Sequence, residues 1–176
     1  MKTRQWLVSI ATVVLCAALS GGVRAQAKGP LAPLDFLVGR WDAIPDATGN
    51  TGSCTFALSV QDQVIVRTNH SDTAAAAGRP ASKHDDLMVI YVDGKTVKAD
   101  YYDSESHVIR YVVQPRGAND VVFLADATAT EPGYRLTYTL QPDGNIKGQF
   151  DFAQPGKAGV WATYLSWGMK KMRTVK

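Results

Sequence analysis

The fold of this chain depends on the stretch Leu34-Asp35-Phe36-Leu37-Val38-Gly39-Arg40-Trp41-Asp42-Ala43. It joins an apolar approach segment, which can form one short helical turn, to the opening of a strand. Gly39 lets the backbone come close to a crossing segment, and Trp41 supplies a large apolar side chain with one N–H to satisfy. The pattern is typical of the closed end of a small β-barrel, and it predicts structural roles for Gly39 and Trp41.

Short strands and turns follow this stretch to the end of the chain. Asp93-Gly94 is the strongest hairpin signal, because it separates two apolar runs. Residues 71–83 contain four consecutive alanines, a glycine and a proline, and are predicted to form a long loop. The spacing gives about ten strands and no helix long enough for a parallel crossover. We therefore predict an all-β protein: a single antiparallel up-and-down β-barrel over residues 34–176.

The first 25 residues have the features of a secretory signal peptide. Lys2 and Arg4 precede the apolar run 6–19, and Val23-Arg24-Ala25 is a small-residue cleavage site. The apolar run is too short to span a membrane, for which about 20 residues are needed. We expect an exported protein, periplasmic or secreted after cleavage near Ala25, with no membrane span and with residues 26–33 as a flexible lead-in.

Removal of this segment changes the charge balance. The chain has 19 Lys and Arg against 16 Asp and Glu, and three of the basic residues and none of the acidic ones lie in residues 1–25. The remainder is neutral, which argues against nucleic acid as a partner. Of the two cysteines only Cys54 remains, so no internal disulfide is expected.

The three histidines and several acids are predicted to meet at one rim of the barrel. His70 ends one strand, His84 ends the long loop and His107 opens a later strand. Alternate turns of a meander lie at the same end, so the rim is expected to collect these histidines and the neighbouring acids Asp85, Asp86, Asp103 and Glu105. No His-x-His or His-Glu-x-x-His spacing is present, and no metal or other cofactor is predicted.

Arginine and tyrosine side chains interrupt the apolar faces of the strands. A barrel interior that contains them would suit a small molecule, mostly apolar with an anionic or polar group, although interior polar groups could equally pair with one another. The predicted ligand-binding residues come from the rim and from these strands: Arg67, Asn69, His70, His84, Asp86, Tyr102, His107, Arg110, Tyr111 and Arg135.

Three functions are compatible with this pattern. An exported small-molecule-binding barrel with a mostly apolar lumen and a His/acid rim is favoured, because no Gly-x-Ser-x-Gly or other nucleophile motif is present. The first alternative is an enzyme that uses His84 or His107 as a general base beside Asp86 or Glu105. The second is a structural or interaction module of the cell envelope, with a filled barrel and an exposed apolar patch.

Four segments resemble a known group of proteins: residues 36–41 (Phe-Leu-Val-Gly-Arg-Trp), 84–91 (His-Asp-Asp-Leu-Met-Val-Ile-Tyr), 101–109 (Tyr-Tyr-Asp-Ser-Glu-Ser-His-Val-Ile) and 164–167 (Tyr-Leu-Ser-Trp). The chain is similar to uncharacterised exported bacterial proteins with a lipocalin-like, or calycin, β-barrel. The resemblance covers most of the chain after residue 25. It implies the same fold as the strand count, and it implies no particular activity.

A more distant resemblance, through the Phe-Leu-x-Gly-x-Trp pattern, is to nitrobindin-like haem-binding barrels. Those proteins hold ferric haem through a histidine near the C-terminal end, and this chain has no histidine after His107. Haem binding in that manner is therefore not expected. The lipocalin pattern also packs a late basic residue on the first-strand tryptophan, a role open to Lys170, Lys171 or Arg173.

Overall fold

The structure is a computed structural model, and it describes residues 26–45, 49–76 and 78–172 of the 176. The predicted signal peptide, residues 1–25, and Arg173 lie outside the described residues. Within the described part, no helix combines the length and the apolar character needed to cross a membrane.

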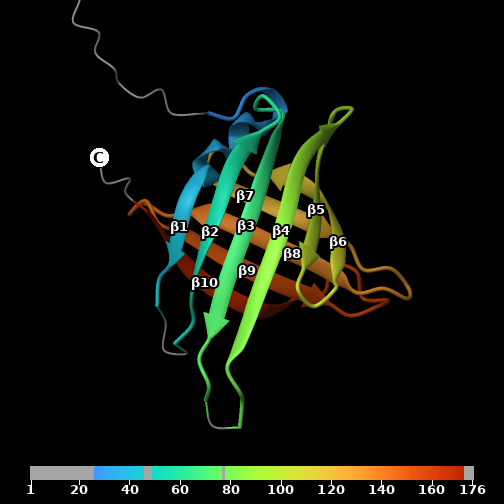
Figure 1. Ribbon diagram of the computed structural model, residues 1–176. Coiled ribbons are helices and arrows are strands. Elements are labelled where there is room, and N and C mark those ends of the chain that lie inside the picture. The colour runs from blue at the N-terminus through green and yellow to red at the C-terminus, as the bar shows by residue number, and fades with distance from the viewer. Residues whose placement is uncertain (1–25, 46–48, 77, 173–176) are drawn as a thin grey trace, which may run out of the picture.

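Ten antiparallel strands close into one barrel (Figure 1). Each strand pairs with its neighbours in the sequence, and the last strand pairs with the first. The prediction of an all-β antiparallel barrel of about ten strands is thereby confirmed. The strands are β1 (Gly39–Ala43), β2 (Thr51–Ser59), β3 (Val64–Thr73), β4 (Ser82–Asp93), β5 (Thr96–Asp103), β6 (Val108–Pro115), β7 (Asp120–Ala125), β8 (Gly133–Leu140), β9 (Ile146–Ala153) and β10 (Ala162–Lys171).

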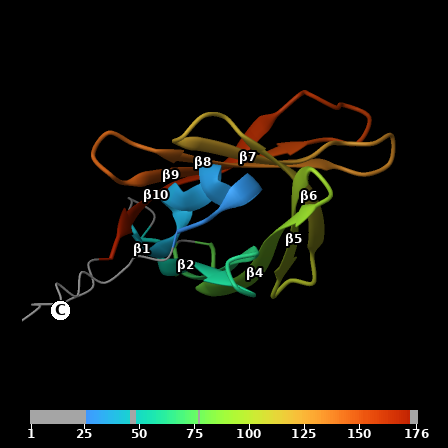
Figure 2. The ribbon, with the colours of Figure 1, turned by 90° about the horizontal axis from the view of Figure 1, so that it is seen from above.

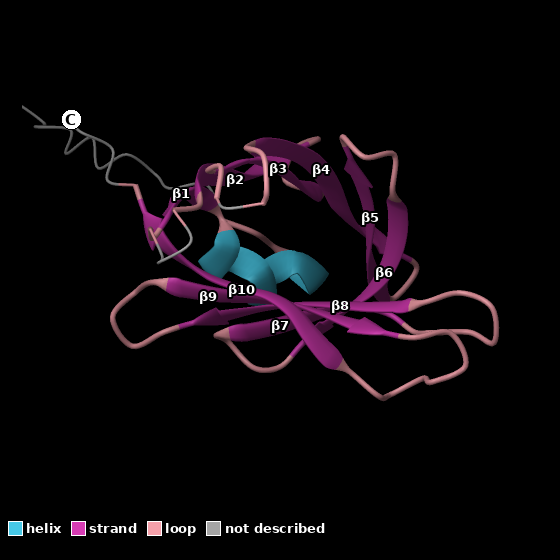
Figure 3. Ribbon diagram, turned by 90° about the horizontal axis from the view of Figure 1, so that it is seen from below, coloured by secondary structure: helices cyan, strands magenta, loops and turns pink. Residues whose placement is uncertain are grey.

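A 3₁₀ helix, η1 (Gly29–Leu37), lies inside one end of the barrel, between the wall of β2–β5 and the wall of β7–β10 (Figures 2 and 3). A 3₁₀ helix has three residues per turn, so Leu31, Leu34 and Leu37 share one face, and all three are buried. The helix begins five residues before the predicted turn. Residues 26–33 were predicted to be a flexible lead-in, but most of them are helical, because Leu31 and Leu34 anchor this segment in the core.

Trp41 closes the same end, as predicted. Its indole is 1% exposed, and its Nε1–H donates a hydrogen bond to the carbonyl of Leu37, 2.7 Å away. The Nζ of Lys171 lies 4.8 Å from the Trp41 ring centre and donates to the carbonyl of Val38 at 2.9 Å. A Cβ at Gly39 would lie 2.7 Å from Lys171 Cε. The lack of a side chain at Gly39 therefore leaves room for Lys171, and Lys171 is the basic residue that packs on Trp41.

Aromatic side chains occupy the middle of the barrel. Tyr138 is fully buried, and its ring meets those of Phe56, Phe123 and Trp167 edge to face at centroid distances of 5.6–6.1 Å. Gly148 lies opposite both Tyr138 and Trp167, and a Cβ there would overlap the indole of Trp167. The centre of the barrel is therefore a packed core, held by the geometry that aromatic pairs prefer.

The connection between β3 and β4 is shorter than predicted. The sequence indicated a loop over residues 71–83, but β3 continues to Thr73 and β4 starts at Ser82. The extra residues form a regular ladder, in which Ser71 pairs with His84 and Asp72 with Lys83. Cross-strand pairing overrides the weak strand preference of Ser and Asp here. His84 therefore lies within a strand, where its direction is fixed.

Candidate functional site at the barrel mouth

The end of the barrel opposite η1 carries the three histidines of the chain and several of the acids. The odd-numbered strands end here, whereas η1 and the turns after the even-numbered strands lie at the other end. We call this end the mouth. Two walls line it: β3–β6 contribute polar side chains, and β8–β10 contribute aromatic ones.

An ion pair between Arg67 of β3 and Asp86 of β4 lies on the inner face of the polar wall. Nη1 of Arg67 is 2.7 Å from Oδ1 of Asp86, and the two side chains are 6% and 3% exposed. Asn69 donates to Oδ2 of Asp86 at 3.0 Å. Burial raises the pKa of Asp86 although Arg67 opposes the shift. Because Asp86 neutralises the charge of Arg67 within the barrel, Arg67 is expected to attract an anionic ligand only weakly.

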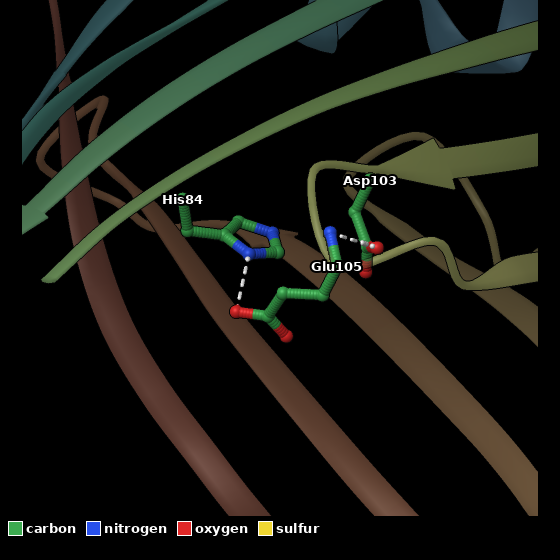
Figure 4. Close-up of side chains that lie close together, drawn as sticks. All are labelled: His84, Asp103 and Glu105. Carbon is green, nitrogen blue, oxygen red and sulfur yellow. Dashed lines mark hydrogen bonds and ion pairs between the residues drawn. The ribbon is translucent and has the colours of Figure 1, made fainter.

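A second group, which we call the mouth cluster, lies nearer the solvent: His84, Tyr101, Asp103, Glu105 and His107. The Tyr101 hydroxyl joins two members, since it is 3.1 Å from Nε2 of His84 and donates to Oδ2 of Asp103 at 3.2 Å. Nδ1 of His84 is 3.5 Å from Oε1 of Glu105 (Figure 4). Nδ1 of His107 is 2.9 Å from Oδ2 of Asp103.

Asp103 is the most firmly held side chain of the mouth cluster. Its Oδ1 accepts the backbone N–H groups of Glu105 and His107 at 3.0 and 2.9 Å, and its side chain is only 4% exposed. Burial alone would raise the pKa of Asp103, but the hydrogen bonds from His107 and Glu105 outweigh it and lower the pKa. The carboxylate is therefore held ionised in one orientation, while Glu105 and His107 remain more than half exposed.

The aromatic wall faces the mouth from the other side of the barrel. Tyr134 of β8 stacks on Phe150 of β9 at 5.9 Å and packs against Phe152 at 6.1 Å. Tyr164 of β10 adds an edge-to-face contact with Phe150 and is 72% exposed. The rings form a continuous half-buried apolar surface, which is uncommon beside solvent unless something covers it.

Several predicted site residues do not reach the mouth. His70 points to the outer face, where its ring contacts Asp85 at 2.6 Å and Asp72 at 3.1 Å. The expectation that His70 and Asp85 join the other rim residues is therefore wrong, because Arg67 and Asn69 occupy the inward positions of β3 and period two turns His70 outward. The predicted residues Tyr102, Arg110 and Arg135 also lie on the outer face.

Other predicted residues do face the interior. Arg67, Asn69, His84 and Asp86 point inward along β3 and β4, and Tyr111 of β6 is buried below the mouth. Burial raises the pKa of the Tyr111 hydroxyl. His107 reaches the mouth from the turn before β6.

Tyr101 is the most important residue that the predicted site left out. Tyr101 and Tyr102 are neighbours, and the sequence analysis named Tyr102, which lies on the outer face. The signal was available: Tyr101 is in phase with the buried Val97 and Ala99, so period two places it inside. Tyr102 lies instead in an exposed outer row with its cross-strand neighbours Leu87 and Val108.

Two surface hollows lie away from the mouth. One, of about 360 Å³, is beside η1 and includes Phe36, Trp41 and Lys171 in its lining. The other, of about 230 Å³, is on the outer face of β8 and β9 and includes Arg135 and Asp151. Arg135 donates to Asp151 at 2.9 Å and lies over the Trp161 ring, so its charge is already partnered.

No protein-family model and no curated protein sequence matches the chain.

Proposed function

We propose that this protein is an exported, calycin-like β-barrel that binds a small molecule at its mouth. The observation that carries the proposal is the pairing of two unlike walls at one end of the barrel. Half-buried aromatic rings line one wall, and fixed hydrogen-bonding groups line the other. Ligand sites commonly combine an apolar surface with a few fixed polar groups.

The packed centre of the barrel limits where such a ligand can lie. Phe56, Phe123 and Tyr138 fill the space that an open lumen would offer. The ligand is accordingly expected to lie across the mouth, with an apolar part on Tyr134 and Phe150. Its polar part would meet Asp103 and Glu105, whose carboxylates favour hydrogen-bond donors, because Arg67 is already neutralised by Asp86.

Native mass spectrometry tests the proposal directly. The protein purified from its own host is expected to carry a mass that disappears on denaturation. Loss of that mass in Glu105→Gln or Phe150→Leu, with retention in Asp143→Asn, would locate the ligand at the mouth. Asp143 is a suitable control because it is an exposed acid in the turn between β8 and β9, at the η1 end of the barrel. A host-purified protein without any such mass would contradict the proposal.

Export is tested separately by N-terminal sequencing of the protein recovered outside the cytoplasm. Cleavage near Ala25 is expected to leave a chain that begins at about Gln26. Ala27 is buried, and its N–H donates to Asp35 at 2.9 Å, so the barrel's contacts start just after the predicted cleavage site. A chain that retains residues 1–25 at its final location would contradict cleavage.

A second candidate function is general acid–base catalysis by the histidines of the mouth. Nε2 of His84 lies 3.5 Å from Oδ2 of Asp86, and Nδ1 lies 3.5 Å from Glu105, so an imidazole is placed between two carboxylates. Hydrolysis of a panel of p-nitrophenyl esters and phosphates is the measurement. Any activity is expected to vanish in the double variant His84→Gln/His107→Gln, and undiminished activity there would exclude these histidines as the base.

A third candidate, an interaction module of the cell envelope, is favoured by the packed core together with the outer row of Leu87, Tyr102 and Val108. These side chains are 39%, 43% and 54% exposed and lie side by side across β4, β5 and β6. Chemical cross-linking in the host, compared between the wild type and Tyr102→Ser, tests this candidate. Identical cross-linked products in the two would contradict it.

A further inference from the structure

The mouth cluster brings three metal-ligating side chains from different parts of β4–β6 to one point. His84 comes from β4, Asp103 from the end of β5 and Glu105 from the following turn, and one ligand atom of each lies within 4.8 Å of the others (Figure 4). We propose that His84, Asp103 and Glu105 bind a divalent transition-metal ion of the Zn²⁺ type. The inference concerns the same Asp103 and Glu105 that the proposed function assigns to the ligand's polar part, but its test uses the metal ion alone, so the two proposals can fail separately.

The hydrogen bonds of Tyr101 decide which nitrogen of His84 is free. Tyr101 has one hydroxyl proton, and it donates that proton to the ionised carboxylate of Asp103, which can only accept. The contact of 3.1 Å between Tyr101 and His84 therefore requires His84 to donate through Nε2–H. In the neutral ring, Nδ1 must then carry a lone pair.

That lone pair points at a carboxylate. Nδ1 of His84 is 3.5 Å from Oε1 of Glu105, so two acceptors face each other with no proton between them in the neutral ring. Two ligands of a tetrahedral Zn²⁺ site, each about 2 Å from the ion, lie roughly 3.3 Å apart. The observed separation matches this value, and a cation between the two atoms would turn a repulsive contact into an attractive one.

The surroundings also resemble those of histidine ligands in known metal sites. Such a histidine usually donates its second N–H to a fixed acceptor, which sets the tautomer and the ring orientation. Here Nε2 of His84 faces the Tyr101 hydroxyl and Oδ2 of the buried Asp86, at 3.1 and 3.5 Å. Arg67 and Asn69 fix Asp86 in turn. The ring is therefore held with Nδ1 toward the mouth.

The other residues of the mouth cluster, Asp103 and His107, leave the proposed site open to solvent and can complete the coordination shell of the ion. Asp103 is held by two backbone N–H groups, and its Oδ2 also accepts from Tyr101 and contacts His107. His107 is 58% exposed and can turn to become a fourth ligand or continue to orient Asp103. One imidazole with two carboxylates favours Zn²⁺, Co²⁺ or Mn²⁺ over Mg²⁺ and Ca²⁺, which prefer all-oxygen sites.

Isothermal titration calorimetry of the metal-stripped protein with Zn²⁺ is the first test. One ion per chain is expected to bind, and His84→Gln and Glu105→Gln are each expected to weaken binding by at least about tenfold. His70→Gln is the matched control, because His70 also lies between two carboxylates but on the outer face. Equal loss in His70→Gln, or unchanged binding in His84→Gln, would overturn the assignment.

Two further measurements keep the test independent of folding and of activity. Far-UV circular dichroism of each variant shows whether the barrel persists, and only folded variants are compared. Nitrogen-15 NMR of the histidine rings in the metal-free protein is expected to show His84 as the Nε2–H tautomer, with Nδ1 shifting when Zn²⁺ is added. A His84 ring in the Nδ1–H tautomer, or one that does not respond to Zn²⁺, would overturn the proposal.

Discussion

Arg67 and Asp86 form a charge pair across β3 and β4 that is almost completely hidden from solvent, with 2.7 Å between Nη1 and Oδ1. The pair lies between the packed aromatic core and the mouth cluster. It holds Asp86 beside His84 and thereby links the stability of the barrel to the geometry of the candidate site.

Removing one partner of this pair is expected to be more harmful than removing both. Asp86→Asn leaves the charge of Arg67 buried without compensation, and the free energy of unfolding is expected to fall by about 3–5 kcal/mol. The double variant Arg67→Met/Asp86→Leu should recover most of that loss. Urea unfolding measures both changes, and a double variant less stable than Asp86→Asn would contradict the argument.

The outer-face contacts of His70 predict a pH-dependent contribution to stability. Its hydrogen bonds to Asp85 and Asp72 raise the pKa of His70 above the ordinary value of 6.5. Because the pKa is higher in the folded state, protonated His70 stabilises the fold fully below the unfolded-state pKa. The contribution is lost as the pH rises through the folded-state value. NMR titration should place the His70 pKa above 6.5.

His70→Gln should abolish this part of the pH dependence, so that the difference in stability from the wild type is largest at low pH. A His70 that titrates at or below 6.5 would show that the two carboxylates do not hold the ring.

Lys171 is expected to stabilise the closed end of the barrel. Lys171→Met removes both the cation–π contact with Trp41 and the hydrogen bond to the carbonyl of Val38. The expected loss is about 1–2 kcal/mol in urea unfolding. Lys170→Met is the matched control, because the neighbouring side chain points to the other face of β10. An equal effect of the two substitutions would contradict a specific role for Lys171.

Gly148 is expected to be indispensable because the indole of Trp167 lies directly on it. Gly148→Ala forces a methyl group into the ring and should cost about 1–3 kcal/mol. Adding Trp167→Leu, which removes the obstructing indole, should make the alanine better tolerated. A Gly148→Ala protein as stable as the wild type, measured by urea unfolding, would show that Trp167 can move aside freely.

The strand pattern was readable from the sequence because alternation and turn residues are local signals. The Asp93-Gly94 turn and the ten strands follow from them. The extension of β3 and β4 into the supposed loop depends on cross-strand pairing, which no local pattern displays. Likewise, the choice of Lys171 among the basic residues of the tail depends on the register of β10 against β1.

The candidate site was only partly predictable, for a related reason. That histidines and acids collect at one end follows from the meander, but which of them face inward depends on the phase of each strand. The inward positions of Arg67 and Asn69 would have excluded His70, and the buried Ala99 would have selected Tyr101 over Tyr102. The contact between His84 and Glu105 also needs the exact course of the β5–β6 turn, which residue types alone do not specify.

The pairing of β1 with β10, which closes the barrel, has a consequence for how the chain folds. Among the described residues, three registered pairs join β1 to β10: Trp41–Lys171, Asp42–Lys170 and Ala43–Met169. Backbone hydrogen bonds from Ile44 to Gly168 and from Met172 to Arg40 flank them, whereas nine pairs join β2 to β3. Neighbouring hairpins can form as the chain emerges, but this pairing must wait for the last strand. Until then both edges of the sheet are unpaired, and β10 of one copy can complete β1 of another with the same three pairs. Strand-exchanged dimers are therefore expected where newly made chains are at high local concentration before β1 and β10 have paired.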